Sequence, residues 1–368
     1  MNNQEDLKFK IALTLIPKIG AANAKYLIKQ CGSAEAVFKE SNSALRKIPR
    51  MSRFIDGILD SKAAFHRAEK EIKFIQERAI QVLFYTDSNY PQRLKHCSDS
   101  PVLLYFKGVC DFNKPRIVGV VGTRNISDYG RMVTAKLIEE LFPYNVTIAS
   151  GMAYGIDICS HRESLNHGIT TVGVMAHGLD RIYPDEHYSI AAKMLKNGGI
   201  LTEYMSGTIP DRQNFPTRNR IVAGICDAIV VVEAAAKGGA LITADIAQSY
   251  NRDVFAFPGN VNAPFSVGCN NFIRDNKAAL ITSAADLAFQ MGWDLKATVK
   301  SNSVQSKLFV ELNEEEQQVV NILLAGEIDI DTLAIKGAIP FSKIGAILFS
   351  LEMKGVIRAS PGKKFSLL

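Results

Sequence analysis

The spacing of apolar residues divides the chain into three regions. Up to about residue 83, apolar residues recur every three or four positions, as at Leu7, Ile11 and Leu15 and again at Phe65, Ile72 and Ile75, which is typical of amphipathic helices. From about residue 115 to residue 292, short apolar runs alternate with helical patterns. After residue 300, three helical patterns precede a short hairpin pattern. The pattern predicts three domains, at residues 1–83, 84–299 and 300–368.

Two similar phrases interrupt the helical pattern of the first region. Residues 16–20 read Ile-Pro-Lys-Ile-Gly and residues 48–52 read Ile-Pro-Arg-Met-Ser, and helical patterns follow at residues 21–30 and 53–59. This weak repeat resembles paired helix-hairpin-helix units, in which a tight turn presents backbone N–H groups to a phosphate at a helix N-terminus. The second copy lacks the turn glycine, so a purely structural helical cap stays open as an alternative.

The middle region is expected to form a parallel sheet covered by helices on both faces, because its strands are apolar almost throughout. Strands are predicted at residues 116–121, 146–149, 171–176, 199–203, 228–233, 254–258 and 279–282, and a short strand at 102–106 lies in the turn-rich connector of residues 85–114. Helices are predicted at residues 127–142, with Ser127 as N-cap, and at 156–166, 186–195 and 241–250. The expected fold is α/β, a Rossmann-like doubly wound parallel sheet.

The last region has the pattern of a small winged-helix domain. A polar linker at residues 300–307 precedes helices predicted at 314–324, 331–336 and 342–354, and a hairpin follows at 356–367. Asn313 and Glu316 form the sequence signature of a capping box. Basic and acidic residues are equal in number here, and the presumed recognition helix carries only Lys343 and Lys354. This balance favours a protein-contact or structural role over DNA binding.

Charge and cysteine usage narrow the class of protein. The net charge is +6, and the whole excess lies in the first hundred residues, which favours an anionic partner. The six cysteines contain no C-x-x-C pair, so we expect buried thiols in a reducing cytoplasm rather than a zinc knuckle or a disulfide framework. No apolar run reaches about 18 residues and the first ten residues are polar, so neither a membrane span nor a secretory signal is expected.

Glycine-bearing loops follow three of the predicted strands. They are Gly122-Thr123-Arg124, Ser150–Gly155 and Lys237-Gly238-Gly239, with Thr243 one turn into the helix after the third loop. Glycine lets a backbone approach a ligand closely, and helix N-termini attract anions. Three such loops at one sheet edge would line a groove with several anion sites, which fits a strand of phosphates better than one small molecule. The expected phosphate-binding residues here are Gly122, Thr123, Arg124, Ser150, Gly151, Ala153, Gly155, Lys237, Gly238, Gly239 and Thr243.

A basic and aromatic run at residues 214–220 completes this candidate site. The run lies in a long loop that enters a helix, and it supplies Arg218, Asn219 and Arg220 as further phosphate ligands. Phe215 is a candidate for stacking on a base, a sequence-tolerant contact of about 1–3 kcal/mol. The alternative is that the arginines pair with local carboxylates such as Asp211 and Glu233, and that Phe215 belongs to the core.

The sequence argues against a nicotinamide or flavin cofactor, against a Cys–His catalytic pair and against a metal site. The G-x-G-x-x-G fingerprint is absent and no acidic residue ends the second strand, which argues against NAD or FAD. Cys159 and His161 are two positions apart on a predicted helix and therefore point to different sides. Asp180, Asp185 and His187 match no standard metal spacing. We expect no catalytic residue, no metal and no cofactor.

The phrases at these loops resemble, in order along the chain, those of the DprA/Smf family (DNA-processing protein A). They are Val121–Arg124, Ser150–Asp157, His177–Asp180 with Tyr183-Pro184, Phe215–Gly224, Val232–Ala234, Ile242–Ala244, Phe257–Gly259 and Gly268–Asn270. The resemblance implies a cytoplasmic homodimer that coats incoming single-stranded DNA, protects it from nucleases and helps load the RecA recombinase in natural transformation. It also implies phosphate contacts from Arg124, residues 150–155, Arg218, Arg220 and Lys237. Many members have a serine where this chain has Gly238.

Two other functions stay open at this point. The family fold resembles that of the lysine-decarboxylase-like phosphoribohydrolases, which process nucleotides and use a P-G-G-x-G-T-x-x-E phrase. Residues 237–245 keep two of its glycines but lack the Gly-Thr pair and the glutamate that would assist glycosidic cleavage. The other alternative is a structural or adaptor protein that acts through the winged helix. Binding of single-stranded DNA without catalysis is the favoured function.

Overall fold

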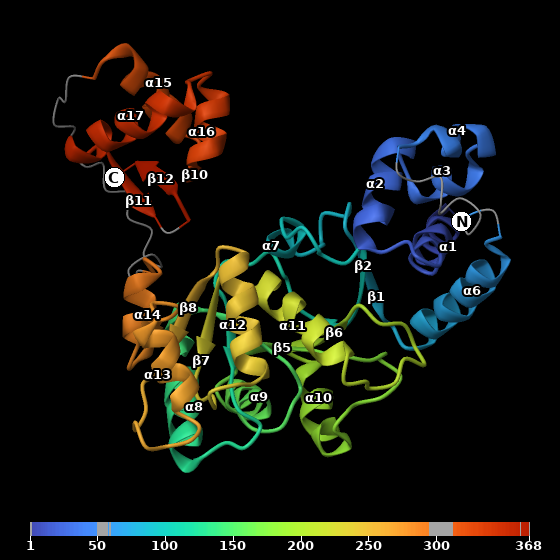
Figure 1. The fold of residues 1–368 in the computed structure, drawn as a ribbon, viewed down its shortest axis with the longest axis horizontal. Coiled ribbons are helices and arrows are strands. Elements are labelled where there is room, and N and C mark those ends of the chain that lie inside the picture. The colour runs from blue at the N-terminus through green and yellow to red at the C-terminus, as the bar shows by residue number, and fades with distance from the viewer. Residues whose placement is uncertain (1, 50–57, 59, 294–311, 361, 368) are drawn as a thin grey trace. The chain divides into compact units, whose positions relative to one another are not determined.

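The computed structural model describes residues 2–49, 58, 60–293, 312–360 and 362–367. The chain forms two compact units, residues 1–284 and 285–368 (Figure 1). Residues 50–57 and 59 contain most of the second helix-hairpin-helix phrase and of the helix predicted after it, and residues 294–311 contain the predicted linker. These expectations therefore lie outside the described residues.

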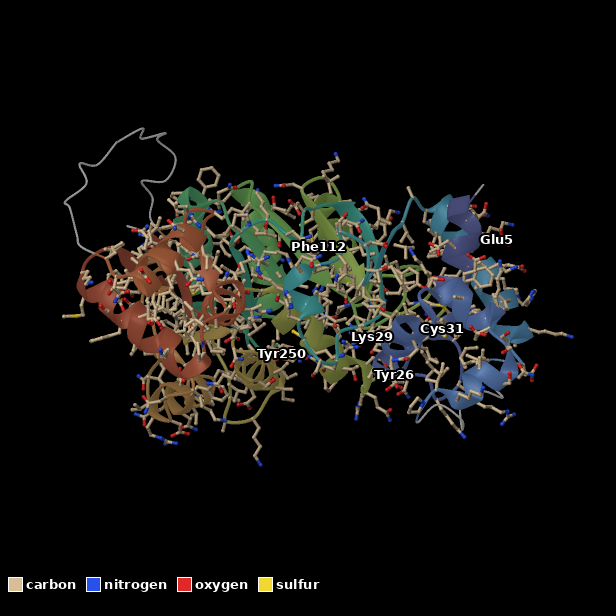
Figure 2. The ribbon with its side chains drawn as sticks, turned by 90° about the horizontal axis from the view of Figure 1, so that it is seen from above. Glu5, Tyr26, Lys29, Cys31, Phe112 and Tyr250 are labelled. Atoms are coloured by element: carbon tan, nitrogen blue, oxygen red, sulfur yellow. The ribbon has the colours of Figure 1, made fainter. Side chains whose placement is uncertain are left out.

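The first unit begins with helices whose apolar faces pack on one another. They are α1 (Asn2–Thr14), α2 (Ala21–Cys31), α3 (Ala34–Lys39), α4 (Asn42–Lys47) and α6 (Lys62–Glu77). Ile11, Leu27 and Ile72 are buried in a core that continues into Phe84 and Tyr105 of the neighbouring sheet. The helical prediction for this region is confirmed for the described residues up to residue 77, with Cys31 at the end of α2 (Figure 2).

The helical prediction for residues 81–83 is wrong, because these residues belong to strand β1 (Gln81–Phe84). Strand β1 pairs antiparallel with β2 (Leu103–Val109), and β2 pairs antiparallel with β6 (Gly198–Thr202). Phe112, labelled in Figure 2, packs edge-on against Phe106 of β2 with ring centroids 4.9 Å apart. A strand of four residues has no periodicity of its own that separates it from a helix end, and its partner lies some twenty residues further along the chain.

The described residues form one large sheet in the order β1-β2-β6-β5-β4-β3-β7-β8-β9. The parallel strands are β3 (Ile117–Val121), β4 (Thr147–Ser150), β5 (Thr170–Val174), β6, β7 (Ala228–Val231), β8 (Asp253–Ala256) and β9 (Ala279–Leu280). Every residue of β3 is buried. Strand β3 has β4 on one side and β7 on the other, so the order of the chain reverses here, and ligands bind at such switch points in open α/β sheets.

Helices cover both faces of this sheet, as expected. They are α7 (Gln92–Lys95), α8 (Asp128–Leu141), α9 (Ile156–Asn166), α10 (Tyr188–Met194), α11 (Asn214–Ile225), α12 (Gly239–Ser249) and α13 (Val267–Arg274), with short 3-10 turns η2 (Phe142–Tyr144) and η3 (Asp185–His187). The second unit starts within the next helix, α14 (Ala284–Gln290). Helices α11 and α12 lie side by side (Figure 1) and share one core cluster with the strands, whereas α9 and α10 contribute to another. The predicted N-cap of α8 is confirmed, because the Ser127 hydroxyl oxygen accepts a 3.1 Å hydrogen bond from the Gly130 N–H.

The start of the central strand is fixed by a carboxylate. The Ile117 N–H donates to Asp227 Oδ2 at 2.7 Å, and the Arg93 guanidinium lies 2.5 Å from Asp227 Oδ1. This pair joins α7 of the connector to the first strand of the doubly wound sheet. Among the described residues, no helix combines the length and the apolar character that crossing a membrane requires.

The second unit has the winged-helix arrangement. Its elements are α15 (Glu314–Leu323), β10 (Ile328–Asp329), α16 (Ile330–Lys336), α17 (Phe341–Met353), β11 (Ile357–Ser360) and β12 (Lys364–Leu367). Strand β10, which the sequence did not indicate, pairs with β12 beside the predicted hairpin. The lysines of α17 both pair with carboxylates: Lys343 with Glu315 at 3.4 Å and Lys354 with Glu316 at 2.6 Å.

Glu316 is the polar centre of this second unit. It accepts hydrogen bonds from the Asn313 N–H at 2.9 Å and from the Ser350 hydroxyl at 2.7 Å, in addition to those from Lys354. The predicted capping box with Asn313 is confirmed. Hydrogen bonds from Lys354, Ser350 and Asn313 lower the pKa of Glu316 to about 2. One carboxylate therefore joins the start of α15 to the end of α17.

We predict that Glu316 makes the winged-helix unit sensitive to acid. The folded-state pKa of Glu316 lies below its ordinary value of 4.5, so the stabilisation is complete above about pH 4.5 and is lost as the pH falls toward 2. Glu316→Gln should therefore accelerate hydrogen exchange of the α15 and α17 amides near pH 7, and the difference from wild type should shrink below pH 4. Glu315→Gln, at an exposed ion pair, is the control and should change exchange little. Equal protection of wild type and Glu316→Gln at pH 7 would contradict the prediction.

Candidate functional site

A cavity of about 810 Å³ opens at the switch point, beyond the carboxyl ends of β3, β4, β5 and β7. This volume lies in the range of about 300–1,000 Å³ that ligand pockets occupy. Residues from all three glycine-bearing loops and from the first turns of α11 and α12 line the cavity. The predicted site residues among them are Gly122, Thr123, Arg124, Gly151, Ala153, Phe215, Arg218, Asn219, Lys237, Gly238, Gly239 and Thr243.

Backbone hydrogen bonds of Thr123 lock the loops to one another. The Thr123 N–H donates to the Glu233 carbonyl at 2.8 Å, and the Thr123 carbonyl accepts from the Ile156 N–H at 3.1 Å. This close approach depends on Gly155, whose φ is +78° and whose added Cβ would lie 2.1 Å from the Thr123 carbonyl oxygen. Only glycine fits there. Gly155 therefore shapes the cavity by holding two loops together, although it does not itself line the cavity.

The floor of the cavity contains a buried arginine and a buried carboxylate. Arg218 of α11 is 5% exposed and donates a hydrogen bond to the Val174 carbonyl at the end of β5. A Cβ on Gly151 would lie 2.4 Å from Asp157 Oδ2 and 2.6 Å from Arg218 Nη2, so the absence of a side chain at Gly151 makes room for both charged groups. Burial raises the pKa of Asp157 and lowers that of Arg218, and the attraction between the two charges opposes both shifts.

The helix N-termini around the cavity differ in how they are capped. The sequence suggested an anion site at the helix after the first loop, but the N-terminus of α8 is already occupied. The Ser127 N–H donates to Glu233 Oε2 at 3.0 Å, and the Ser127 hydroxyl donates to Glu233 Oε1. By contrast, the N-cap of α12 is Gly238, and no side chain hydrogen-bonds the first turn of this helix. The N–H groups of this turn and the helix dipole favour an anion at this end of α12.

Three cations line the cavity without a carboxylate partner in the described part of the chain. Arg124, Arg212 and Lys237 are exposed, and none has a carboxylate within ion-pair distance in the described part of the chain. Lys237 lies next to Gly238 at the uncapped start of α12. Arg212 was not among the site residues predicted from the sequence, and it lines the cavity. Unpaired cations at an uncapped helix N-terminus favour an anionic ligand.

Aromatic rings stand beside these cations. The Phe215 ring is half-buried, its centroid lies 5.4 Å from Arg124 Cζ and 6.3 Å from the Tyr183 ring, and it belongs to no core cluster. The alternative placement of Phe215 in the core is therefore wrong. Tyr183 and Tyr154 also line the cavity and are 47% and 44% exposed. Tyr154 lies in the loop of residues 150–155, for which the family resemblance implies phosphate contacts, whereas no role was predicted for Tyr183.

Three of the predicted site residues do not line the cavity: Ser150, Gly155 and Arg220. The Ser150 hydroxyl is buried and donates to the Val120 carbonyl at 2.6 Å. Arg220 forms an ion pair with Glu203, with 13% and 16% of the two side chains exposed. The predicted loop at residues 214–220 is helical, and positions two apart on a helix face different sides, so Arg218 and Arg220 cannot point into one groove. Arg220 pairs with a carboxylate, as one alternative proposed, but with Glu203 rather than Asp211 or Glu233.

Comparison with known families matches most of the chain to two domains. The family described as DNA recombination-mediator protein A matches residues 81–292, which contain the sheet and every residue that lines the cavity. The DprA winged helix domain matches residues 310–363. The second match lies within the second unit, and the first match begins at β1, after the N-terminal helices, and ends eight residues beyond the division at residue 284.

Individual relatives and solved structures agree with this family. Protein Smf of Escherichia coli is 31% identical, with 92% of this chain and 89% of that protein covered, and Protein Smf of Synechocystis is 39% identical, with 59% and 55% covered. The X-ray structure of DNA processing protein A from Streptococcus pneumoniae aligns with a TM-score of 0.66 at 31% identity, over 79% of this chain and 98% of that one. DNA processing protein A from Helicobacter pylori, solved to describe its single-stranded DNA binding mode, aligns with a TM-score of 0.52 at 28% identity, over 56% and 93%. The chain therefore belongs to the DNA recombination-mediator protein A family, DprA/Smf.

Proposed function

We propose that this chain binds single-stranded DNA at the cavity of the switch point, without a reaction on the DNA. The observation that carries the proposal is the set of cations without a carboxylate partner, Arg124, Arg212 and Lys237, beside the half-buried ring of Phe215 and the exposed ring of Tyr183. Cations and aromatic rings along one groove are the features of sites that bind unpaired strands. The single-stranded DNA binding described for the Helicobacter pylori relative supports the same function here.

Each part of the site would contact a different part of the strand. The N–H groups of the first turn of α12, with Lys237 beside them, would hold one phosphate, and Arg124 and Arg212 would neutralise neighbouring phosphates. Bases would stack on Phe215, and this contact is tolerant of sequence because every base has a π-face. Arg218 contributes the positive floor of the cavity, where Asp157 partly offsets its charge.

The wider role follows from the family. We infer that the chain forms a homodimer in the cytoplasm, coats incoming single-stranded DNA, protects it from nucleases and helps load the RecA recombinase in natural transformation. Membership of the recombination-mediator family supports this role. The dimer and recombinase surfaces have no counterpart among the features described above.

The enzymatic alternative finds little support in the cavity. Asp157 is the one carboxylate among the described residues that line it, and Arg218 lies beside that carboxylate. Asp245, where the phosphoribohydrolase phrase has its glutamate, is exposed outside the cavity and pairs with Lys277 at 2.8 Å. We therefore favour binding over glycosidic cleavage.

We predict that Arg124→Ala and Lys237→Ala each weaken binding of a twelve-nucleotide single strand by about tenfold. Loss of one charge-assisted hydrogen bond to a phosphate costs about 1.5 kcal/mol, which corresponds to this factor. Fluorescence anisotropy with a labelled oligonucleotide measures the change. Lys193→Ala, at an exposed lysine of α10 outside the cavity, is the matched control and should bind as wild type does. If a folded Arg124→Ala/Lys237→Ala double variant binds with full affinity, the DNA does not bind in this cavity.

We predict the opposite pattern for Arg220→Ala. This change leaves the mostly buried Glu203 carboxylate without its cation, and breaking such a pair costs about 3 kcal/mol of unfolding free energy. Urea denaturation should therefore show a lower midpoint, whereas the folded fraction should bind the oligonucleotide nearly as tightly as wild type does. A large loss of affinity at unchanged stability would instead identify Arg220 as a DNA contact.

We predict a moderate dependence of binding on salt. Three neutralised phosphates give a slope of about −2 for the logarithm of the binding constant against the logarithm of salt concentration on single-stranded DNA. Removal of both Arg124 and Lys237 should reduce the slope by about 1.4. Blunt duplex DNA should bind more weakly than a single strand longer than about six nucleotides. Equal affinity for duplex and single strand, measured in the same titration, would contradict the proposed function.

A further inference from the structure

A histidine that sequence analysis left without a role lies in the wall of the cavity. His177 follows strand β5, lines the cavity together with Met175 and Ala176, and is 1% exposed. The His177 Nδ1 atom lies 2.8 Å from the Gly178 carbonyl oxygen. The Nε2 atom is buried and has no hydrogen-bond partner in the described part of the chain.

The protonation of the His177 ring determines which groups its Nε2 atom can bind. A carbonyl oxygen only accepts, so Nδ1 carries the proton and donates it to Gly178. Burial lowers the pKa of His177, which keeps the ring neutral. In a neutral imidazole with a proton on Nδ1, the Nε2 atom is an acceptor. A buried acceptor without a donor is costly, so the site is built for a group that donates a hydrogen bond.

The phosphates of a bound strand cannot supply that donor, because their oxygens only accept. Each of the four bases, however, carries an N–H or NH₂ group on its Watson–Crick edge, and proteins that bind unpaired bases hydrogen-bond this edge. In duplex DNA the same donors are engaged by the partner strand. A single acceptor in the cavity wall can therefore distinguish unpaired bases from paired ones without distinguishing the four bases from one another.

We propose that His177 Nε2 accepts a hydrogen bond from the Watson–Crick edge of an unpaired base in the cavity, and that His177 thereby selects single strands. The proposal rests on the proposed function and deepens it, because phosphate contacts alone do not exclude a duplex. The aromatic rings of Phe215 and Tyr183 line the same cavity and offer the stacking surface for such a base. His177 is then a specificity-determining residue of the DNA site.

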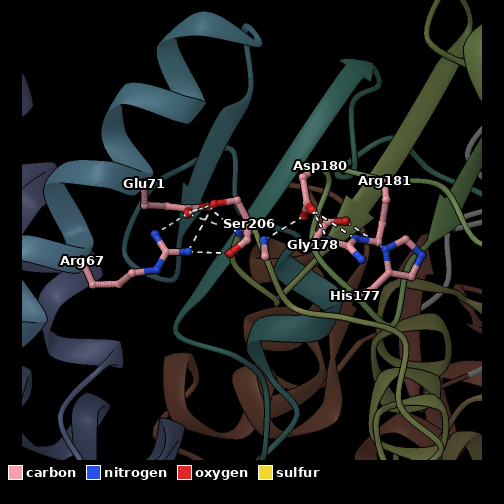
Figure 3. Close-up of polar contacts among 8 residues, drawn as sticks. Arg67, Glu71, His177, Gly178, Asp180, Arg181 and Ser206 are labelled. Carbon is pink, nitrogen blue, oxygen red and sulfur yellow. Dashed lines mark hydrogen bonds and ion pairs between the residues drawn. The ribbon is translucent and has the colours of Figure 1, made fainter.

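Contacts from two other segments hold the histidine loop in place (Figure 3). The Gly178 N–H donates to the Thr208 carbonyl at 3.1 Å, and Asp180 Oδ1 accepts from the Gly207 N–H at 2.9 Å. The neighbouring Ser206 N–H donates in turn to Glu71 of α6 at 3.0 Å.

The N-terminal helices complete this support. Glu71 is 1% exposed, and the guanidinium of Arg67, one turn earlier on α6, lies 2.9 Å from Glu71 Oε2 (Figure 3). A chain of polar contacts therefore runs from the N-terminal helices to the loop that follows β5. This support limits the movement of the histidine loop and favours one position for the acceptor.

A chemically modified strand tests the proposal on the full chain. Thymine has one N–H donor on its edge, and N3-methylthymidine lacks it while keeping the phosphates and the stacking faces. We expect wild type to bind a twelve-nucleotide N3-methylthymidine strand about tenfold more weakly than the unmodified thymidine strand. His177→Leu should bind both strands equally, because it has no acceptor. His177→Gln, which keeps a neutral acceptor, should retain part of the discrimination.

His167→Leu is the control, because His167 lies at the end of α9 outside the cavity and this variant should discriminate as wild type does. Equal binding of both strands by wild type would overturn the proposal, and this comparison needs no variant. The same methyl penalty in wild type and His177→Leu would also overturn it, because the methyl group would then clash elsewhere. A strand that lacks its terminal 3′ hydroxyl is a further comparison. If only this strand loses affinity, His177 Nε2 accepts a hydrogen bond from the terminal hydroxyl and not from a base, and the proposal is overturned. If wild type fails to bind even the unmodified strand, the proposed function itself is wrong.

Discussion

The backbone hydrogen bonds of Thr123 are the constraint on which the cavity depends. They join the loops after β3, β4 and β7 beside the central strand, where the chain order of the parallel strands reverses. The hydrogen bond from the Ile156 N–H to the Thr123 carbonyl requires Gly155, which brings its backbone against that carbonyl at a positive φ. With these loops fixed, the uncapped start of α12, the arginine on the first loop and the Phe215 ring of α11 face a common space.

The charges around this space divide into two groups with different roles. Arg218 and Arg220 are buried and interact with carboxylates, so their first role is to hold α11 in place beneath the cavity. Arg124, Arg212 and Lys237 are exposed and unpaired among the described residues, so their charge is available to a ligand. In the winged-helix unit, Lys343 of α17 and Lys354 at its C-cap pair with Glu315 and Glu316, so these two charges are engaged within the protein.

The sequence predicted those parts of the fold that local patterns determine. Buried strands β3 to β8, the Ser127 cap and the capping box of Asn313 and Glu316 all follow from neighbouring residues. Strand β1 was missed because it depends on pairing with β2. The start of α11 was predicted as a loop, whereas it is helical and contains Pro216, which a helix tolerates in its first turn. That error also placed Arg220 in the cavity. The roles of Arg212, Tyr183 and His177 depend on tertiary contacts, so no local pattern revealed them.

A crystal structure of the full chain with a thymidine oligonucleotide tests the central claim most directly. The account predicts phosphate oxygens within hydrogen-bond distance of Lys237, Arg124 and the first N–H groups of α12, and a base stacked on Phe215. A strand bound on another surface, with the cavity at the switch point empty, would contradict it.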